Sequence, residues 1–396
     1  MEKETQETKK QRKETRSVSA SSARTTALLN LPIEIKDKIL LSLPVEALLR
    51  FRCVIRDYSR FHNPHFIKMH LNRQIEINNG STIIIANGCK IYKVDLGSFS
   101  NPIPLDIPFL NPTHASQLRL AGSCNGLLCL TDWDPYSCVV YLWNPATGGF
   151  KQLPSHNYIF EGESYNCVLG FGYDHISGKF KVLARRTTCL YRLEAIVYTL
   201  GASSWRSIGE LKYYLLGEKS QVFGGCLHWI VRDSKTRLDS IVSFSVENEK
   251  FKEIPMPPNN STKSLGCYTT SCLTALGGRL SIFYIYYSGF KRERYELWVK
   301  MDDGLENTTW TKQLSFNLSD IPPHINGYGN MWGFKDGQVL LEGPCRTLAL
   351  FNPVNGHVTT TTMYVPAKRF VFKLYSYIEG LGMLMDEDRE DVHQNS

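Results

Sequence analysis

Apolar residues recur at helical spacing in the segment from residue 31 to residue 51. Ile35, Ile39 and Leu43 follow one another at every fourth position, and charged residues occupy most of the other face. A Leu-Pro step precedes each of the two apolar segments, at residues 31–32 and 43–44. Proline is tolerated in the first turn of a helix, where its missing N–H would have no partner in any case. The pattern therefore predicts two short helices, each with proline near its start.

Helices of this length do not hold together in isolation, because helices below roughly 12–15 residues are marginal in water. Their apolar faces must pack either on the rest of the chain, as a small helical cap, or on a partner protein. Helical spacing alone favours the cap.

From about residue 73 the helical pattern gives way to short runs rich in β-branched and aromatic residues. Turn residues interrupt these runs about every ten positions, which indicates an all-β sandwich, barrel or propeller. We predict strands at residues 82–86, 126–131, 139–143, 180–184, 196–200, 226–231 and 282–287.

An internal repeat distinguishes among these architectures. An aromatic residue is followed seven positions later by a second one, with polar turn residues between them, which frames a hairpin. The pairs are Trp143/Phe150, Tyr173/Phe180, Tyr198/Trp205 and Phe244/Phe251, with Phe351/Val358 and the longer Trp298/Trp310 as variants. Turns such as Asn125-Gly126 and Gly224-Gly225 precede most of these hairpins.

The first members of the pairs recur at a spacing that matches a propeller blade. Trp143, Tyr198, Phe244, Trp298 and Phe351 lie close to 50 residues apart, and kelch-type blades run at about 50 residues. We predict a β-propeller of about six blades, closed by a late strand at residues 369–377 against the first blade. Two stacked sandwiches are the alternative.

Composition and charge exclude several function classes. Apolar residues make up 42% of the chain, which supports an ordinary globular core. The net charge of +7 is spread thinly, so we expect no nucleic-acid binding. No run of 18 apolar residues and no apolar leader is present, so we expect no membrane association and a location in the cytoplasm or nucleus. The eleven cysteines then read as reduced, buried side chains.

Two cysteine patterns are weighed as signs of a catalytic nucleophile or a zinc site. Residues 122–126 fit a G-x-C-x-G nucleophile elbow, but a helix would have to follow, and the apolar run at 127–130 reads as a strand. Cys124/Cys129 and Cys267/Cys272 are C-x4-C pairs without a matching second half for zinc. No phosphate-binding or dinucleotide-binding glycine motif occurs. We predict no catalytic residue, no metal and no cofactor.

The dense pattern of residues 31–54, LPIEIKDKILLSLPVEALLRFRCV, followed by NPHFIKMHL at 63–71, resembles the F-box of plant F-box proteins. The resemblance implies docking on the Skp-type adaptor of an SCF ubiquitin ligase and, through it, on a cullin. The residues implied to form that contact, or the small core beneath it, are Leu31, Pro32, Ile35, Ile39, Leu40, Leu43, Pro44, Leu48 and Leu49. Residues 54–58, Val-Ile-Arg-Asp-Tyr, depart from the Val-Cys-Lys-Ser-Trp usual in the family.

The β-rich region is similar to the plant F-box-associated domain. The matching segments are residues 122–130, 142–148, 170–174, 197–200 with 204–206, 227–229 and 251–255. This resemblance supplies the domain type, whereas the propeller was inferred from the repeat.

The sequence thus predicts an α+β multidomain chain, with a short all-α F-box followed by an all-β propeller. The predicted segments are a disordered tail at 1–26, the F-box at 27–72, the propeller at 73–382 and an acidic tail at 383–396. We expect a non-catalytic receptor that brings an unknown protein substrate to the ligase, with specificity in loops 155–166, 209–221, 255–266 and 318–330. The alternatives are a protein- or glycan-binding module outside a ligase and an enzyme built on the propeller.

Overall fold

The computed structural model describes residues 32–51, 61, 63–78, 82–87, 90–95, 102–109, 118–134, 137–155, 168–187, 192–215, 221–233, 236, 238–258, 267–276, 279–289, 291–301, 309–317, 319, 321, 331–333, 338–342, 348–352, 355, 358–361 and 373–382. The predicted tails at 1–26 and 383–396 lie outside these ranges. In the described part of the chain, no helix combines the length and apolarity needed to cross a bilayer.

Two compact units make up the chain, residues 1–74 and residues 75–396, and each is considered by itself. The first contains helices α2 (Ile33–Ser42) and α3 (Val45–Phe51), which are the two helices predicted from the Leu-Pro steps. Helix α4 (Pro64–Asn78) begins in the first unit and extends past its boundary. Pro32 and Pro44 lie immediately before α2 and α3, where no backbone donor is required.

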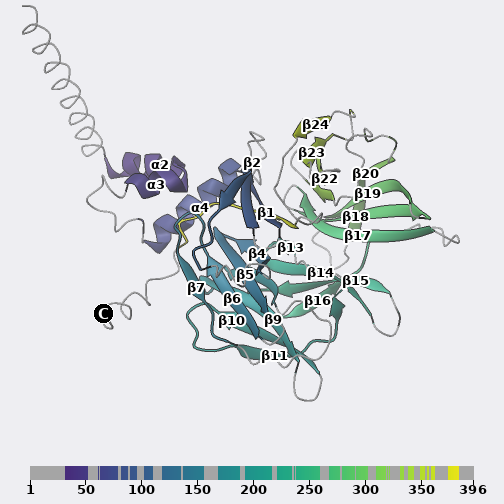
Figure 1. Ribbon diagram of the computed structural model, residues 1–396, viewed down its shortest axis with the longest axis horizontal. Coiled ribbons are helices and arrows are strands. Elements are labelled where there is room, and N and C mark those ends of the chain that lie inside the picture. Colours follow the sequence, from purple (N-terminus) through teal and green to yellow (C-terminus); the bar gives the residue numbers. More distant parts are fainter. Residues whose placement is uncertain are drawn as a thin grey trace, which may run out of the picture. The chain divides into compact units, whose positions relative to one another are not determined.

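The second unit is built from antiparallel sheets, and its described strands form six of them (Figure 1). Sheet 1 consists of β25 (Lys373–Ser376), β1 (Thr82–Asn87), β2 (Lys90–Asp95) and β3 (Ile103–Leu105). Sheet 2 consists of β4 (Leu118–Cys124), β5 (Leu127–Asp134), β6 (Ser137–Trp143) and β7 (Phe150–Gln152). Sheet 3 consists of β8 (Val168–Asp174), β9 (Lys179–Thr187), β10 (Leu193–Thr199) and β11 (Arg206–Glu210).

The remaining three sheets follow in chain order. Sheet 4 consists of β13 (Gln221–Phe223), β14 (Cys226–Arg232), β15 (Asp239–Ser245) and β16 (Phe251–Ile254), with β12 (Tyr214–Leu215) also paired to β14. Sheet 5 consists of β17 (Cys267–Leu276), β18 (Arg279–Ser288), β19 (Lys291–Met301) and β20 (Thr309–Asn317). Sheet 6 consists of β21 (Met331–Gly333), β22 (Val339–Glu342), β23 (Leu348–Phe351) and β24 (Val358–Thr361).

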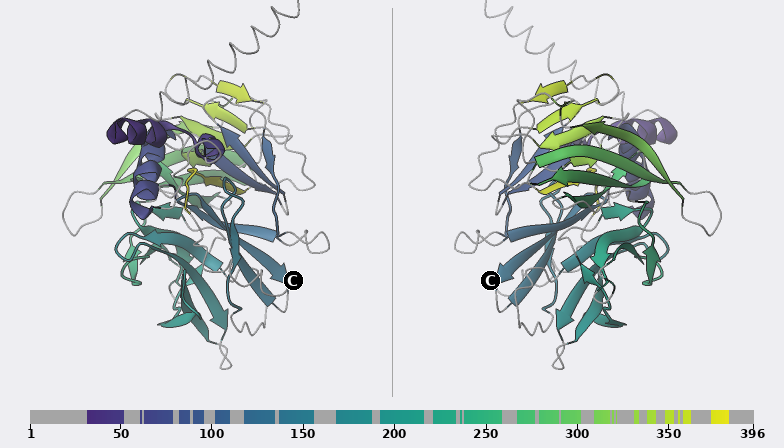
Figure 2. Two further views of the ribbon diagram at one scale, coloured as in Figure 1. Left: turned by 90° about the vertical axis from the view of Figure 1, so that its left-hand side faces the viewer. Right: turned by 90° about the vertical axis from the view of Figure 1, so that its right-hand side faces the viewer.

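Sheets 2 to 6 are meanders of strands consecutive in the chain, whereas sheet 1 adds β25 from the C-terminal part of the chain to β1, β2 and β3. Neighbouring sheets contact each other one after the next. β25 contacts β4, β4 contacts β8, β8 contacts β14, β14 contacts β17, and β17 contacts β21. Figure 2 shows the long green strands of sheet 5 beside the yellow-green strands of sheet 6, and the two share one apolar cluster. The predicted closing strand is confirmed in its described part, because β25 pairs antiparallel with β1.

The seven-residue aromatic spacing corresponds to residues that face each other across a hairpin. Trp143 is opposite Phe150, and Phe244 is opposite Phe251, whose ring centroid lies 4.9 Å away. The repeat nevertheless mixes two kinds of hairpin, since Tyr173/Phe180 joins the first two strands of sheet 3 rather than the last two. Trp298/Trp310 is not a facing pair at all: a register shift after Leu297 sets Trp298 opposite Lys312.

A second repeat, missed at the level of sequence, ties neighbouring sheets together. FKQLP at residues 150–154 and FKEIP at 251–255 each end in a proline carbonyl that accepts an indole N–H from the next sheet. Trp205 Nε1 donates to Pro154 O at 2.7 Å, and Trp310 Nε1 donates to Pro255 O at 3.0 Å. The outer strand of one sheet is thereby held to the outer strand of the next.

Sheets 3 and 4 approach each other so closely that residue 172, in the segment GFGYD at 170–174, must be glycine. A Cβ on Gly172 would lie 2.8 Å from Cγ2 of Val246, which follows β15 in sheet 4. Real Cβ atoms do not approach other carbons this closely, so sheets 3 and 4 pack as they do because this position carries no side chain.

Candidate functional site

Helices α2 and α3 form a short hairpin whose bend is fixed by the second Leu-Pro step. The N–H of Leu43 closes α2 by donating to Leu40 O at 3.2 Å, and the N–H of Leu48 opens α3 by donating to Pro44 O at 3.1 Å. Leu40, Val45 and Leu48 are buried. The hairpin therefore has its own small apolar core.

Helix α4 holds this hairpin through a face that the sequence analysis missed. His70 and Gln74 are buried one turn apart, and the Nε2 atoms of both donate to the carbonyl of Leu43, at 2.9 Å and 3.2 Å. Asn63 caps the helix, because its Oδ1 accepts the N–H of His65 at 2.8 Å. Phe66, His70 and Gln74 recur at every fourth position, and this spacing is the signal that could have revealed the buried face.

The candidate adaptor-binding residues divide into two groups. Leu40 and Leu48 belong to the buried core, at 8% and 0% exposure. The others that the structure describes are partly or largely exposed: Pro32, Ile35, Ile39, Leu43, Pro44 and Leu49. Leu31 and the divergent segment 55–58 lie outside the described residues.

The exposed apolar surface of α2 extends beyond the predicted residues. Ile33 is 51% exposed and Ile35 is 45% exposed, and both lie in the first turn of the helix. A shallow hollow of about 320 Å³ adjoins α3, and its described lining comprises Pro44, Glu46, Ala47, Arg50 and Phe51. Branched apolar side chains left in water are suited to docking on another protein.

Cys124 does not form a nucleophile elbow. It ends strand β4, and β5 rather than a helix follows the Asn125-Gly126 turn. Both turn residues have positive φ, 48° and 85°, as a tight two-residue hairpin requires. Burial raises the pKa of the Cys124 thiol to about 12, against a weaker opposing hydrogen bond from the Tyr173 backbone, so no thiolate is available at neutral pH.

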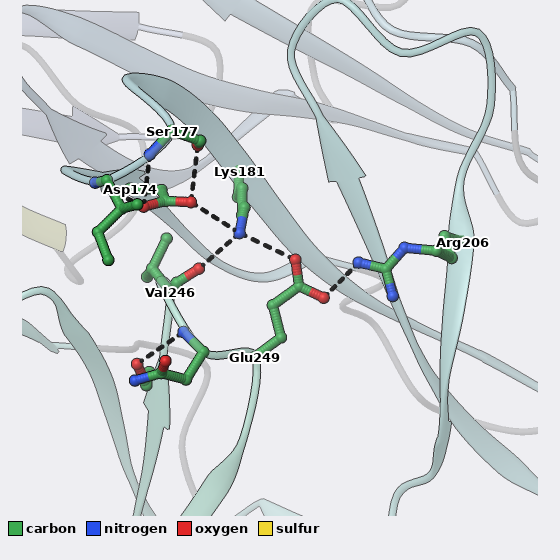
Figure 3. Close-up of polar contacts among 9 residues, drawn as sticks. Asp174, Ser177, Lys181, Arg206, Val246 and Glu249 are labelled. Carbon is green, nitrogen blue, oxygen red and sulfur yellow. Dashed lines mark hydrogen bonds and ion pairs between the residues drawn. The ribbon is translucent and has the colours of Figure 1, made fainter.

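A buried cluster of charged side chains joins sheets 3 and 4 (Figure 3). Lys181 of β9 lies 3.0 Å from Oδ2 of Asp174 and 2.9 Å from Oε1 of Glu249, and donates to Val246 O at 2.9 Å. Arg206 of β11 pairs with the second oxygen of Glu249. Asp174 ends β8, and Glu249 lies in the turn between β15 and β16.

The protonation states of this cluster suit a structural rather than a chemical role. Burial opposes ionisation of Asp174, but hydrogen bonds from Ser177, Lys181 and two backbone amides outweigh it and hold its pKa well below the usual range. Burial likewise opposes the charge on Lys181, yet its two carboxylate partners raise its pKa. A lysine that stays protonated cannot act as a base or nucleophile at neutral pH.

The described side chains do not assemble a metal site. No group of three His, Cys, Asp or Glu residues is arranged to hold an ion within the parts of the chain that the structure describes. The two described cysteines of the first C-x4-C pair, Cys124 and Cys129, are free thiols on adjacent strands.

F-box proteins of a plant are similar to most of the chain. F-box/kelch-repeat protein At3g23880 of Arabidopsis thaliana is 28% identical over 83% of this chain and 89% of its own length. Putative F-box protein At3g17500 of the same plant is 25% identical over 78% of this chain and 82% of its own length. Among solved structures, TolB from Acinetobacter baumannii aligns with 72% of this chain and 64% of its own at a TM-score of 0.42 and 8% identity, which is too low to support an inference.

A family description covers sheets 2 to 5. Residues 105–328, more than half of the chain, match the F-box associated beta propeller domain. The match begins at the end of β3 and extends past β20, so it includes the Lys181 cluster and both Trp–Pro contacts. The chain therefore belongs to the plant F-box proteins that carry an F-box associated beta propeller domain.

Proposed function

We propose that this protein is a substrate receptor of an SCF-type ubiquitin ligase, working in the cytoplasm or nucleus. The helical unit binds the Skp-type adaptor, which links it to the cullin, and the sheet domain binds a protein substrate. The receptor catalyses no bond formation itself. It raises the effective concentration of substrate lysines near the ubiquitin-charged enzyme.

The exposed first turn of α2 is the observation that carries the adaptor half of this proposal. Ile33 and Ile35 are about half exposed although the unit has a filled core of its own. Burying such side chains on a partner contributes up to about 1.5–3 kcal/mol each. The core residues Leu40 and Leu48 then support the docking face without touching the adaptor.

The sheet domain is inferred to be a six-bladed propeller with each sheet as one blade. The sequential contacts between neighbouring sheets and the pairing of β25 with β1 support this arrangement. Pairing of the last strand with the first removes a free sheet edge. A closed ring of this kind gives the substrate a rigid platform with loops at two rims.

Co-expression with the adaptor tests the proposal. The full chain is expected to elute with the Skp-type adaptor as a stoichiometric complex in size-exclusion chromatography. An Ile33→Asp/Ile35→Asp variant is expected to lose at least about 2 kcal/mol of binding, or about thirtyfold in affinity, because two charges would be forced into an apolar contact. Unfolding of both units should be unchanged, since neither side chain is buried.

Ile176→Asp is the matched control, because Ile176 is 76% exposed and lies in the β8–β9 turn of the other unit. It should leave the complex intact. A wild-type chain that elutes alone would overturn the ligase role in favour of a free-standing binding module. Continued co-elution of the double variant would show that the docking face is misassigned.

A further inference from the structure

Strand β20 is the outer strand of sheet 5, the last of its four strands, and it is unusually long for that position (Figure 1). It has 9 residues, whereas the outer strands β3 and β7 have 3, β16 and β24 have 4, and β11 has 5 in the described part of the chain. A strand at the end of a sheet presents a row of N–H and C=O groups that the sheet itself does not pair. The edge of β20 is therefore a surface on which another extended segment can pair.

The main chain of β20 is paired on one side only within the part of the chain that the structure describes. The strand pairs antiparallel with β19, and its residues 310–316 make no main-chain hydrogen bond to the described residues beyond this pairing. Thr309 and Asn317, at its ends, make further contacts. We refer to residues 310–316 as the open edge. At about 3.4 Å per residue it is about 24 Å long, enough for a strand of ordinary length.

The two faces of the open edge differ in chemistry. Leu314 is partly buried against the apolar cluster that sheet 5 shares with sheet 6. Lys312 lies on the other face, where its Nζ is 5.6 Å from the ring centroid of Trp298, which packs against the cluster shared with sheet 4. Residues of an added strand would point alternately to these two faces. A β-branched residue suits the face of Leu314, because such side chains pack well between neighbours on a sheet.

Lys312 is the one ionisable side chain of β20 and gives the other face a positive charge. Its side chain is 46% exposed, and its Nζ lies 3.3 Å from Oε1 of the buried Glu296. Arg294 lies 3.6 Å from the same oxygen, so one carboxylate is shared between two cations and the group has a net positive charge. Opposite charges on facing residues of paired strands stabilise the pair, and like charges oppose it. The edge therefore favours an acidic residue beside Lys312.

The same features disfavour pairing of β20 with a second copy of the chain. Gln313 has no partner on β19, because Leu314 pairs with Leu297 and Lys312 pairs with Trp298, and it is therefore the extra residue of a β-bulge. Bulges and lysines are the devices by which edge strands avoid unspecific pairing. Two copies of β20 side by side would also bring positive charge to positive charge. A segment of another protein with the opposite charge fits the edge better.

We propose that the open edge of β20 binds an extended segment of the protein substrate as an additional strand of sheet 5, and that acidic and β-branched residues alternate in this segment. The assignment rests on the receptor role proposed above and names the conformation and chemistry of what is recognised. Main-chain hydrogen bonds along the open edge supply affinity, and alternate side chains supply selection. The acidic residues lie on the face of Lys312, and the β-branched residues lie on the face of Leu314.

Fluorescence anisotropy of a fluorescein-labelled peptide, Thr-Val-Glu-Val-Glu-Val-Thr, tests the assignment on the full chain co-purified with the adaptor. We expect Lys312→Gln to weaken binding by about threefold, because it removes the opposite charge across the strand pair. The matched control is Lys252→Gln, which makes the same change at an exposed lysine of the outer strand β16 and should leave binding unchanged. A peptide with lysine at both glutamate positions should bind at least about tenfold more weakly. Equal losses in the two variants would overturn the assignment.

Peptides N-methylated at every second residue test whether main-chain hydrogen bonds hold the segment. Successive N–H groups of a strand point to opposite sides, so the two alternate sets of methyl groups block opposite edges of the peptide. One set should weaken binding by about tenfold or more, because the lost donors face β20, and the other set should weaken it by less than about threefold. Equal losses with both sets would overturn the added strand.

Hydrogen exchange locates the bound segment without any substitution. Saturating peptide should slow exchange at least about tenfold at those amides of the open edge that point away from β19. Residues 251–254 of the outer strand β16 are the internal control and should exchange at the same rate with and without peptide. Slowed exchange at β16, or unchanged exchange along the open edge, would overturn the assignment.

The same samples separate this assignment from the receptor role and from self-association. Adaptor retention with no peptide binding would overturn the added strand and leave the receptor role standing. Peptide binding without adaptor retention would overturn the receptor role and leave a binding module for extended acidic segments. A chain that elutes as a dimer in size-exclusion chromatography, and dissociates when the peptide is added, would assign the open edge to a second copy instead.

Discussion

Replacing Lys181 by methionine is expected to lower the free energy of unfolding of the sheet domain by about 3 kcal/mol or more. The side chain is 9% exposed and lies between two carboxylates of neighbouring sheets, Asp174 at 3.0 Å and Glu249 at 2.9 Å. Methionine fills a similar volume but leaves both acids buried without their shared cation. Urea denaturation followed by intrinsic tryptophan fluorescence measures the loss.

Arg206→Met is the matched control, because Arg206 pairs with the same Glu249 but its side chain is 60% exposed. Exposed pairs contribute about 0–1 kcal/mol, so this variant should unfold almost as the wild type does. A triple variant, Lys181→Met with Asp174→Asn and Glu249→Gln, should recover much of the loss, since it removes the uncompensated charges. Equal effects of Lys181→Met and Arg206→Met would contradict a buried role for Lys181.

The same site predicts how stability changes with pH. The pKa values of Asp174 and Glu249 are lowered from 3.8 and 4.5, so their contribution is present above those values and is lost as pH falls through the lower folded pKa values. The pKa of Lys181 is raised above 10.5, so its contribution is full below that value and is lost only as pH rises through the folded pKa. The cluster therefore stabilises the domain between about pH 5 and pH 10.

A comparison of wild type and Lys181→Met across pH isolates this effect. Protonated carboxyl groups do not need a cation, so the difference in unfolding free energy should shrink as pH falls below about 4. The measurement is a series of urea denaturations of both proteins from neutral to acidic pH. A difference that stays constant through this range would indicate that Lys181 acts through packing alone.

The parts of the fold that the sequence predicted are those set by neighbouring residues. Trp143 and Phe150 lie seven positions apart and face each other directly, so spacing alone predicts their hairpin. The Lys181 cluster joins residues 174, 181 and 249, and no local pattern connects them. Lys179 and Lys181 lie on the same face of β9 and alternate with Phe180, a pattern that predicts a solvent-facing strand face rather than a contact with sheet 4.

In helices α2 and α3, too, local sequence patterns did not predict which side chains contacts with distant residues would bury. Helical periodicity predicted an apolar stripe through Ile35, Ile39 and Leu43, but it could not tell which side α4 would cover. That choice depends on His70 and Gln74, which lie 27 and 31 residues from the Leu43 carbonyl that they bind. In the structure Leu40 and Leu48 are therefore buried in the core, and the apolar side chains in the first turn of α2 stay exposed.

Ending the chain at residue 372 is expected to destroy the cooperative unfolding of the sheet domain. Strand β25 supplies the only described pairing on one edge of β1, and the segment after it buries Tyr377 and Leu381. With Leu374, these three buried side chains contribute about 1.5–3 kcal/mol each. The predicted loss of about 5 kcal/mol or more is comparable to the whole stability of a typical domain.

Hydrogen bonds add to the apolar contacts that hold this C-terminal segment against sheet 2. Asn144 of sheet 2 donates from Nδ2 to the carbonyls of Gly380 at 3.0 Å and Gly382 at 2.9 Å. Tyr375 donates its hydroxyl proton to Leu120 O at 2.6 Å. The segment therefore joins the first sheet to the second. Its removal takes these partners from the Asn144 amide donor and the Leu120 carbonyl, and leaves an open strand edge that favours association between molecules.

A chain ending at Gly382 is the control, because it keeps every described contact and loses only residues 383–396. It should unfold as the full chain does, whereas the chain ending at 372 should elute as aggregates or as species of higher mass in size-exclusion chromatography. Adding a peptide of residues 373–382 should restore protease resistance by pairing with β1. If the shorter chain remains monomeric and unfolds at the same urea concentration, β25 does not close the domain, and the ring inferred from the six sheets would have to be abandoned.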